Sequence, residues 1–247
     1  MIFDTITIIA ILVAFALGGI LKGATGAGAP IVTIPVIAAF YDVRIAVIIM
    51  VVPNLLTNIG QLYQFRKTIL PSFFTVSFAL GGGIGAFIGT ILLANLSIKI
   101  LTLSVAFIVI IYILLKLIVP SWKLIYEKAT KLVFIMGAAG GVLQGTAGLS
   151  APISITFLNA MKLERNQFIP TISVYFGVMS IFQMPTLYYY DLLNFEIIAA
   201  SLISTLVLLS FMPLGSWIAK SISKENFDKI TLILLAFIAL RIIYINL

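Results

Sequence analysis

Cysteine and histidine are both absent from the 247-residue sequence, and only 9% of its residues are charged. Without cysteine the chain forms no disulfide and offers no thiolate to a metal ion. Without histidine it has no imidazole for acid–base chemistry and no Ser-His-Asp triad. The sequence also shows no nucleophile–base pair and no set of metal ligands, so we expect neither an enzyme nor a protein with a cofactor or a metal.

Hydrophobic residues fill the space that charges leave: they make up 62% of the chain, and the mean hydropathy is +1.23. A soluble domain carries roughly 25% charged residues and about half apolar ones. Apolar runs of about 20 residues, which suffice to cross a hydrocarbon core of about 30 Å, recur along the sequence. The composition therefore predicts an all-α integral membrane protein with many spans.

Charged and turn-forming residues divide the chain into ten apolar segments. The first five lie near 5–22, 29–40, 45–65, 72–94 and 98–118, and the second five near 132–146, 151–161, 166–188, 196–218 and 228–247. No Asp or Glu lies in the interior of a segment, which argues against proton coupling through a carboxylate or histidine relay. Sodium coupling through backbone carbonyls stays open. The polar stretch 119–131 between the two sets is expected to be a cytoplasmic linker.

The two sets repeat one another. A shift of 122 residues places the stretch from Gly19 to Ile31 on the stretch from Gly141 to Ile153 with seven identities in thirteen positions, three glycines and one proline among them. A weaker match joins Gly89 to Gly215. Internal similarity of this kind is typical of transporters. We therefore expect one membrane domain made of two repeats, 1–118 and 132–247.

Because each repeat has five segments, an odd number, the second repeat starts on the opposite side of the membrane from the first. The repeats are then of inverted topology. If the N-terminus lies outside, eleven basic residues fall in inside loops and three fall outside, which agrees with the positive-inside rule. The outside residues are Arg44, Lys99 and Arg241. The sequence thus predicts a multi-pass protein of the cell (inner) membrane with both termini extracytoplasmic.

The second segment of each repeat is too short to span. Pro30 to Phe40 would be about 16 Å long as a helix, half of the hydrocarbon core, and Pro152 to Lys162 is equally short. Each follows a glycine-rich stretch, 23–28 or 145–150, which we expect to be non-helical. Proline suits the first position of a helix. The first two segments of each repeat are therefore predicted to form a broken or re-entrant hairpin.

Two half-helices that begin at membrane depth would point free N–H groups and partial positive charges at one place, where a small anion could bind. Hydroxyl and amide side chains would add donors, with Lys22 opposite Gln144. Close helix packing through Gly19-x-x-x-Gly23 and Gly141-x-x-x-Gly145 is the alternative. The expected substrate-binding residues are Lys22, Gly23, Thr25, Gly26, Gly28, Asn54, Asn58, Gln144, Gly145, Thr146, Gly148 and Ser150.

Three further features have two interpretations each. Asn54, Asn58 and Gln61 form a polar stripe on one helix face, which either bonds neighbouring helices together or lines a pathway. A looser set in the range 173–185, with Ser180 and Gln183, favours the first role. Lys22 either reaches the inner membrane surface along its aliphatic stem or is a buried cation that faces a cavity.

The glycine-rich motifs with their prolines, Gly19 to Pro35 and Gly141 to Pro152, resemble those of the TauE/SafE sulfite exporter family, also called the TSUP permeases, over essentially the whole chain. The resemblance implies small two-repeat membrane proteins that transport, often export, sulfite, sulfonates and other sulfur-containing or organic anions. We therefore expect an exporter of small anions such as sulfite, organosulfonates or carboxylates. An anion channel of the same architecture is the alternative. The expected partners are a small anion and the bilayer, not nucleic acid, and a homo-oligomer stays open.

Overall fold

The structure is a computed structural model that describes residues 5–118, 122–221 and 224–246. These residues form ten α-helices and a short 3-10 turn, η1 (Arg66–Thr68), and contain no strand. Six of the helices, α1, α3, α4, α5, α8 and α9, are long and apolar enough to cross a membrane. The helices are α1 (Thr5–Thr25), α2 (Ala29–Phe40), α3 (Val43–Phe65), α4 (Ser72–Asn95), α5 (Ile98–Ile118), α6 (Tyr126–Ala147), α7 (Ser154–Ala160), α8 (Arg165–Tyr189), α9 (Phe195–Ser221) and α10 (Lys224–Asn246).

The ten predicted segments correspond to the ten helices, and the largest difference lies in the connection between the two sets. Helix α6 begins at Tyr126, six residues before the expected start at 132, so the second part of the stretch 119–131 is helical. Glu127 lies in the first turn, where it suits the helix dipole, and pairs with Lys131 one turn later at 3.4 Å. Residues 119–121 of the connection lie outside the described residues.

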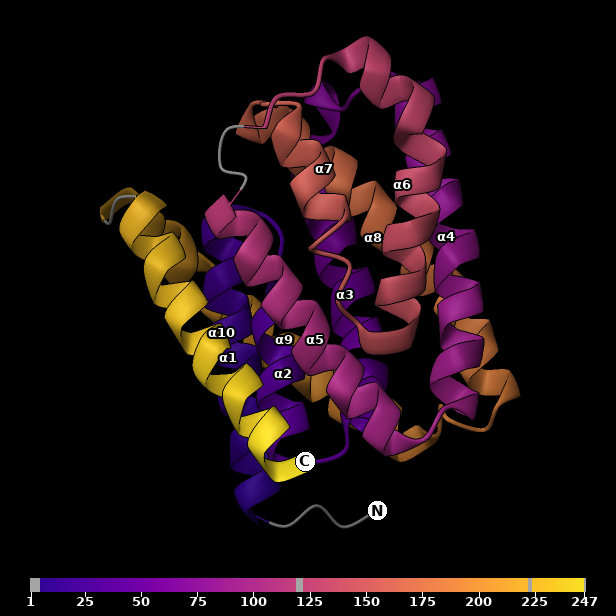
Figure 1. Ribbon diagram of the computed structural model, residues 1–247, viewed down its shortest axis with the longest axis vertical. Coiled ribbons are helices and arrows are strands. Elements are labelled where there is room, and N and C mark those ends of the chain that lie inside the picture. The colour runs from indigo at the N-terminus through magenta and orange to yellow at the C-terminus, as the bar shows by residue number, and fades with distance from the viewer. Residues whose placement is uncertain (1–4, 119–121, 222–223, 247) are drawn as a thin grey trace.

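The two halves of the chain are interleaved rather than stacked as separate bundles (Figure 1). Helix α1 packs against α9, and α4 packs against α6. Two more pairs cross between the halves: α4 with α8, and α3 with α9. Helices α3 and α8 also contact one another along the middle of the molecule, so each half depends on the other for its packing.

Glycines make the closest of these contacts. In α1 and α6, a Cβ added to any of four glycines would collide with a backbone carbonyl of the neighbouring helix. Small residues let helix backbones approach closely where lipid provides no hydrophobic driving force. The pairs are Gly19 with Leu208, Gly23 with Met212, Gly141 with Gly82, and Gly145 with Ala86.

The start of α1 and the end of α10 lie at the same end of the bundle, at the bottom of Figure 1. The end of α5 and the start of α6 lie at the opposite end. The second half of the chain therefore ends at the same end of the bundle at which the first half begins.

Candidate functional site

The first glycine-rich stretch is less irregular than predicted. Helix α1 continues through Gly23 to Thr25, because Gly23 is held against α9, and only the three residues 26–28 are non-helical. Gly26 and Gly28 both have positive φ, 82° and 98°, a conformation that only glycine adopts freely. Pro30 lies in the first turn of α2, where its missing N–H leaves no bond unmade. The predicted break between two helices is present, with narrower limits.

The second stretch differs more from the prediction. Helix α6 runs to Ala147, so Gly145 and Thr146 are helical, and the chain turns at Gly148, whose φ is 71°. Helix α7 begins only at Ser154, two residues after Pro152, and has seven residues against the twelve of α2. The expectation of two equal half-helices, each begun by proline, is therefore wrong: the residues around Pro152 form a turn instead.

Lys22 is buried, with 1% of its surface exposed, so it does not reach the membrane surface as one interpretation had it. Its Nζ donates a hydrogen bond of 3.0 Å to Oδ1 of Asn58 in α3. No acidic side chain of the described residues forms an ion pair with it. An ammonium group that is buried without a counter-ion is unfavourable, because the group loses its hydration without a compensating charge.

Asn58 connects Lys22 to two further polar side chains, those of Asn54 and Ser180. Its Nδ2 donates to Oδ1 of Asn54 at 3.0 Å and to the Asn54 carbonyl at 2.6 Å. Asn54 Nδ2 in turn donates to Oγ of Ser180 in α8 at 3.3 Å. All four side chains are buried. A continuous set of hydrogen bonds therefore joins Lys22 in α1 to the middle of α3 and α8.

A cavity of about 380 Å³ opens beside the first bend. Leu21, Ala24 and Thr25 of α1 line it, and Lys22 lies between the first two in sequence. The side chains of Lys116 and Arg165 contribute two positive charges, and no acidic residue is among the described residues that line the cavity. The positive electrostatic potential of such a lining attracts anions.

Arg165 has a second role at this cavity. Its Nη2 donates to the carbonyl of Gly23 at 3.2 Å, and Oγ of Ser216 donates to the same carbonyl at 3.0 Å. These bonds cap the last turn of α1, whose carbonyls have no partners within the helix. Arg165 thus fixes the first bend and lines the cavity at once.

The other predicted site residues lie in several places. Oγ1 of Thr25 donates to the Leu21 carbonyl at 2.8 Å and lines the cavity. Oγ1 of Thr146 donates to the Gly89 carbonyl at 3.3 Å, toward α4, and Ser150 accepts from Oγ of Ser154 at 3.0 Å. Gln144 is buried, and no hydrogen bond joins it to Lys22. Lys22, Asn54 and Asn58 come together, whereas the polar residues of the second stretch face other neighbours.

Sequence reasoning did not place Lys116 and Arg165 at the site, because both were counted only as inside-loop charges. The sequence did contain a signal for Arg165: it follows the second glycine-rich stretch at a short distance, as Arg44 follows the first. Ser180 and Gln183 were assigned to helix bonding. The bond from Asn54 to Ser180 agrees with that role and joins them to the Lys22 set as well.

The apolar helices, the break between α1 and α2 and the buried lysine are those of a multi-pass membrane protein with a polar centre. Comparison with known families gives the same class: the model of the sulfite exporter TauE/SafE family matches residues 10–242. The chain therefore belongs to the TauE/SafE sulfite exporter family. Neither the curated proteins nor the solved structures gave a significant match.

Proposed function

We propose that the protein exports a small anion, such as sulfite, an organosulfonate or a related carboxylate, and that the anion is the counter-ion of Lys22. The observation that carries this proposal is the burial of Lys22, whose one hydrogen-bond partner among the described residues is an amide oxygen. A bound anion would supply the missing charge. Asn58 keeps the ammonium group oriented while the site is empty of substrate.

The cavity beside the first bend supports a path to Lys22. Lys116 and Arg165 raise the local concentration of anions, and the cavity reaches Thr25 and Ala27 at the bend. Helix α2 begins there without a side-chain cap, so its dipole adds partial positive charge. Thr25, which lines the cavity, lies one turn of α1 after Lys22, so an anion in the cavity would be close to the buried lysine.

Two equivalent contacts support an arrangement of inverted repeats, 1–118 and 132–247 joined by the linker 119–131. Gly89 of α4 lies against the carbonyl of Val142 in α6, and Gly215 of α9 lies against the carbonyl of Ile20 in α1. Val142 is the counterpart of Ile20 under the 122-residue shift, and Gly215 is the counterpart of Gly89 in the weaker match, which needs a shift of 126. The pairing of α1 with α9 likewise corresponds to that of α6 with α4.

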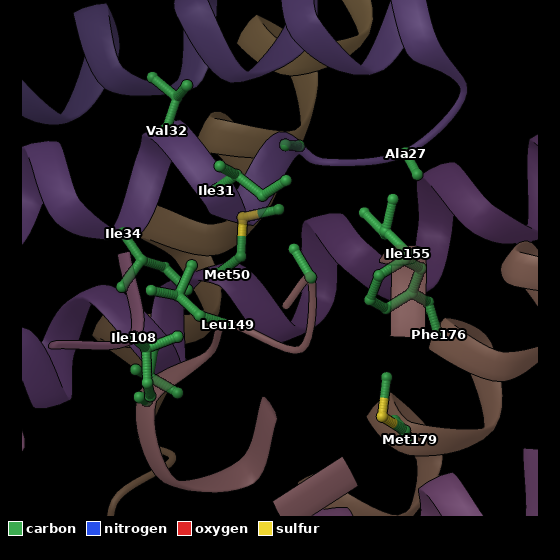
Figure 2. Packing of buried hydrophobic residues seen from close by; sticks show 14 of the residues in the cluster. Ala27, Ile31, Val32, Ile34, Met50, Ile108, Leu149, Ile155, Phe176 and Met179 are labelled. Atoms are coloured by element: carbon green, nitrogen blue, oxygen red, sulfur yellow. The ribbon is translucent and has the colours of Figure 1, made fainter. Parts of the chain in front are cut away.

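The difference between the two bends favours a transporter over a channel. Both bends are buried, but Ala27 of the first bend lines the cavity and none of residues 148–153 of the second bend does; a Cβ on Gly148 would collide with Ile34 and crowd Val47. Ile34 and Leu149 belong to one buried hydrophobic cluster, which Figure 2 shows from close by. In alternating access, each state of a transporter opens the binding site to one side of the membrane and closes it to the other. A first bend that lines a cavity and a second bend that does not would correspond to one such state.

The distribution of basic residues supports loading from the cytoplasm, as export requires. Arg165 lines the cavity together with Lys116 near the end of α5, and the hydrogen bond between Thr68 and Asn166 places Arg66 and Lys67 at the same end of the bundle. The positive-inside rule assigns that end to the cytoplasm. Substrate would then load from the cytoplasmic side.

Flux measurements on purified protein in liposomes test the function. We expect saturable efflux of sulfite, with competition by methanesulfonate or acetate according to their affinity, and no comparable flux of potassium. Flux that rises linearly with anion concentration would favour the channel. Absence of flux for all three anions would refute the proposal.

A further inference from the structure

Helices α3 and α8 run antiparallel, and the bonds Thr68–Asn166 and Asn54–Ser180 define their register. Oγ1 of Thr68, just after α3, donates to the carbonyl of Asn166 at the start of α8 at 2.5 Å. The amide of Leu70 donates to Oγ1 of Thr171 at 3.5 Å. Fourteen residues before Thr68 and fourteen after Asn166, Asn54 and Ser180 are bonded to each other. The two helices therefore stay in contact over this whole length.

Five polar side chains line up along the contact, and we refer to them as the α3–α8 row. On α3, Gln61, Asn58 and Asn54 lie on one face, and on α8 Ser180 and Gln183 continue beyond Asn54. At 1.5 Å per residue the row extends over about 15 Å, half of a hydrocarbon core. Lys22 joins it near the middle, through Asn58.

The two ends of the row hold buried polar atoms without partners. Gln183 is 1% exposed, and neither its Oε1 nor its Nε2 forms a hydrogen bond. Gln61 is 7% exposed, and its Oε1 has no partner either. Ser173, which the register places level with Gln61, has an unpaired Oγ as well. Buried polar groups are nearly always bonded to protein or water, so atoms of this kind call for a partner, which is either water or a ligand.

The same two glutamines are counterparts in the repeat. The 122-residue shift that aligns the glycine-rich motifs places Gln61 on Gln183. Because the helices are antiparallel, counterparts lie toward opposite ends of the contact. Gln61 lies toward the end with Arg66 and Lys67, and Gln183 lies toward the other end.

We propose that Gln61 and Gln183 bind the transported anion on either side of Lys22, so that the α3–α8 row is the transport path. This inference rests on the proposed function. A carboxamide donates two N–H bonds without carrying charge, and a turn of 180° about its terminal bond exchanges its oxygen and its nitrogen. Neutral donors bind an anion weakly enough to release it, while Lys22 supplies the charge between them.

The alternative is that Gln61 and Gln183 bond to buried water and only stabilise the fold. Gln61→Met and Gln183→Met separate the two roles, because methionine keeps the length of the side chain and removes its polar atoms. Gln64→Met, on the exposed side of α3, is the matched control. We expect each buried variant to lower kcat/KM for sulfite efflux at least tenfold with Tm unchanged or raised, and the control to leave both unchanged.

Sidedness gives a second readout that a structural role would not produce. In vesicles of a single orientation, Gln61→Met should raise KM for the anion at the face with Arg66, and Gln183→Met at the opposite face. Gln183→Glu keeps volume but adds a negative charge, so it should reduce flux more than Gln183→Met. If the Met variants show a lower Tm but normal efflux kinetics, the α3–α8 row is not the transport path. Efflux by the wild type would in that case still support the proposed function. Absence of wild-type efflux would refute both.

Discussion

Nζ of Lys22 lies 3.0 Å from Oδ1 of Asn58, although the helices that carry the two residues, α1 and α3, share few other contacts among the described residues. The lysine therefore bridges between two parts of the bundle: α1 packs on α9, and α3 packs on α8 and α9. A cation that is held across such a contact is fixed in place, and two of its three N–H donors have no partner among the described residues.

Replacing Lys22 tests its role as the counter-ion. Lys22→Ala should weaken anion binding at least tenfold, because the positive charge that Lys22 places at the centre is lost. Lys22→Arg keeps the charge but changes its geometry, so it should recover only part of the affinity. Binding is measured by calorimetry on purified protein with sulfite. Full affinity in Lys22→Ala would show that the charge does not contact substrate.

Asn58 should matter for stability as well as for transport. Asn58→Ala leaves the buried ammonium group of Lys22 without its partner, and an unsatisfied buried group costs about 1–3 kcal/mol, more when it is charged. We expect a lower Tm by thermal unfolding in detergent, and reduced efflux. Asn95→Ala is the control, since Asn95 is exposed at the end of α4. Equal stability of the two variants would contradict the role of the Lys22–Asn58 bond.

Much of the fold followed from the sequence because hydrophobicity and helix breakers act locally. The limits of α2 agree within a residue with the apolar segment after Gly28. The behaviour of Gly23 and Gly145 did not follow, because their helical conformation depends on tertiary contacts with Met212 and Ala86. Local propensity disfavours glycine in a helix, and close packing reversed that preference.

Part of the site could also be predicted, because a polar residue within an apolar segment is visible in the local sequence. Lys22, Asn54 and Asn58 were identifiable as polar residues in apolar segments, which must find partners. The hydrogen bonds of Thr146 and Ser150 depend on the position of α4 and on the conformation of the local turn. Neither can be predicted from a single sequence. The cavity with Lys116 and Arg165 arises from seven helices of both halves of the chain.

The glycines at the bends should not tolerate side chains. Gly26 has φ 82°, and a Cβ there would collide with Ile169; Gly148 has φ 71° and meets Ile34. The left-handed conformation alone costs an L-residue about 1–2 kcal/mol. Gly26→Leu and Gly148→Leu should therefore abolish sulfite binding and lower Tm. Gly60→Ala, with open space around it, should leave both nearly unchanged. A Leu variant that folds and binds normally would assign the bends a packing role only.

Reporter fusions test the inverted topology. The basic residues predict that both termini are extracytoplasmic and that the linker 119–131 is cytoplasmic, and the structure places the end of α10 and the start of α6 at opposite ends of the bundle. Alkaline phosphatase should be active after Leu247 and inactive in the linker, and green fluorescent protein should behave in the opposite way. The same compartment for both positions would contradict the inverted repeats.

Export should be driven by the membrane potential. No carboxylate bonds to Lys22 among the described residues, so the anion crosses with its own negative charge uncompensated by a proton. An anion that leaves a cell negative inside gains about 2.3 kcal/mol per charge per 100 mV, which corresponds to a concentration ratio of about 50. We expect sulfite efflux from liposomes to increase when potassium and valinomycin set an inside-negative potential, and to respond little to a pH gradient at constant potential. Empty liposomes give the passive leak. Efflux that ignores the potential and follows the proton gradient would mean that a proton accompanies the anion, and the charge at Lys22 would then need another explanation.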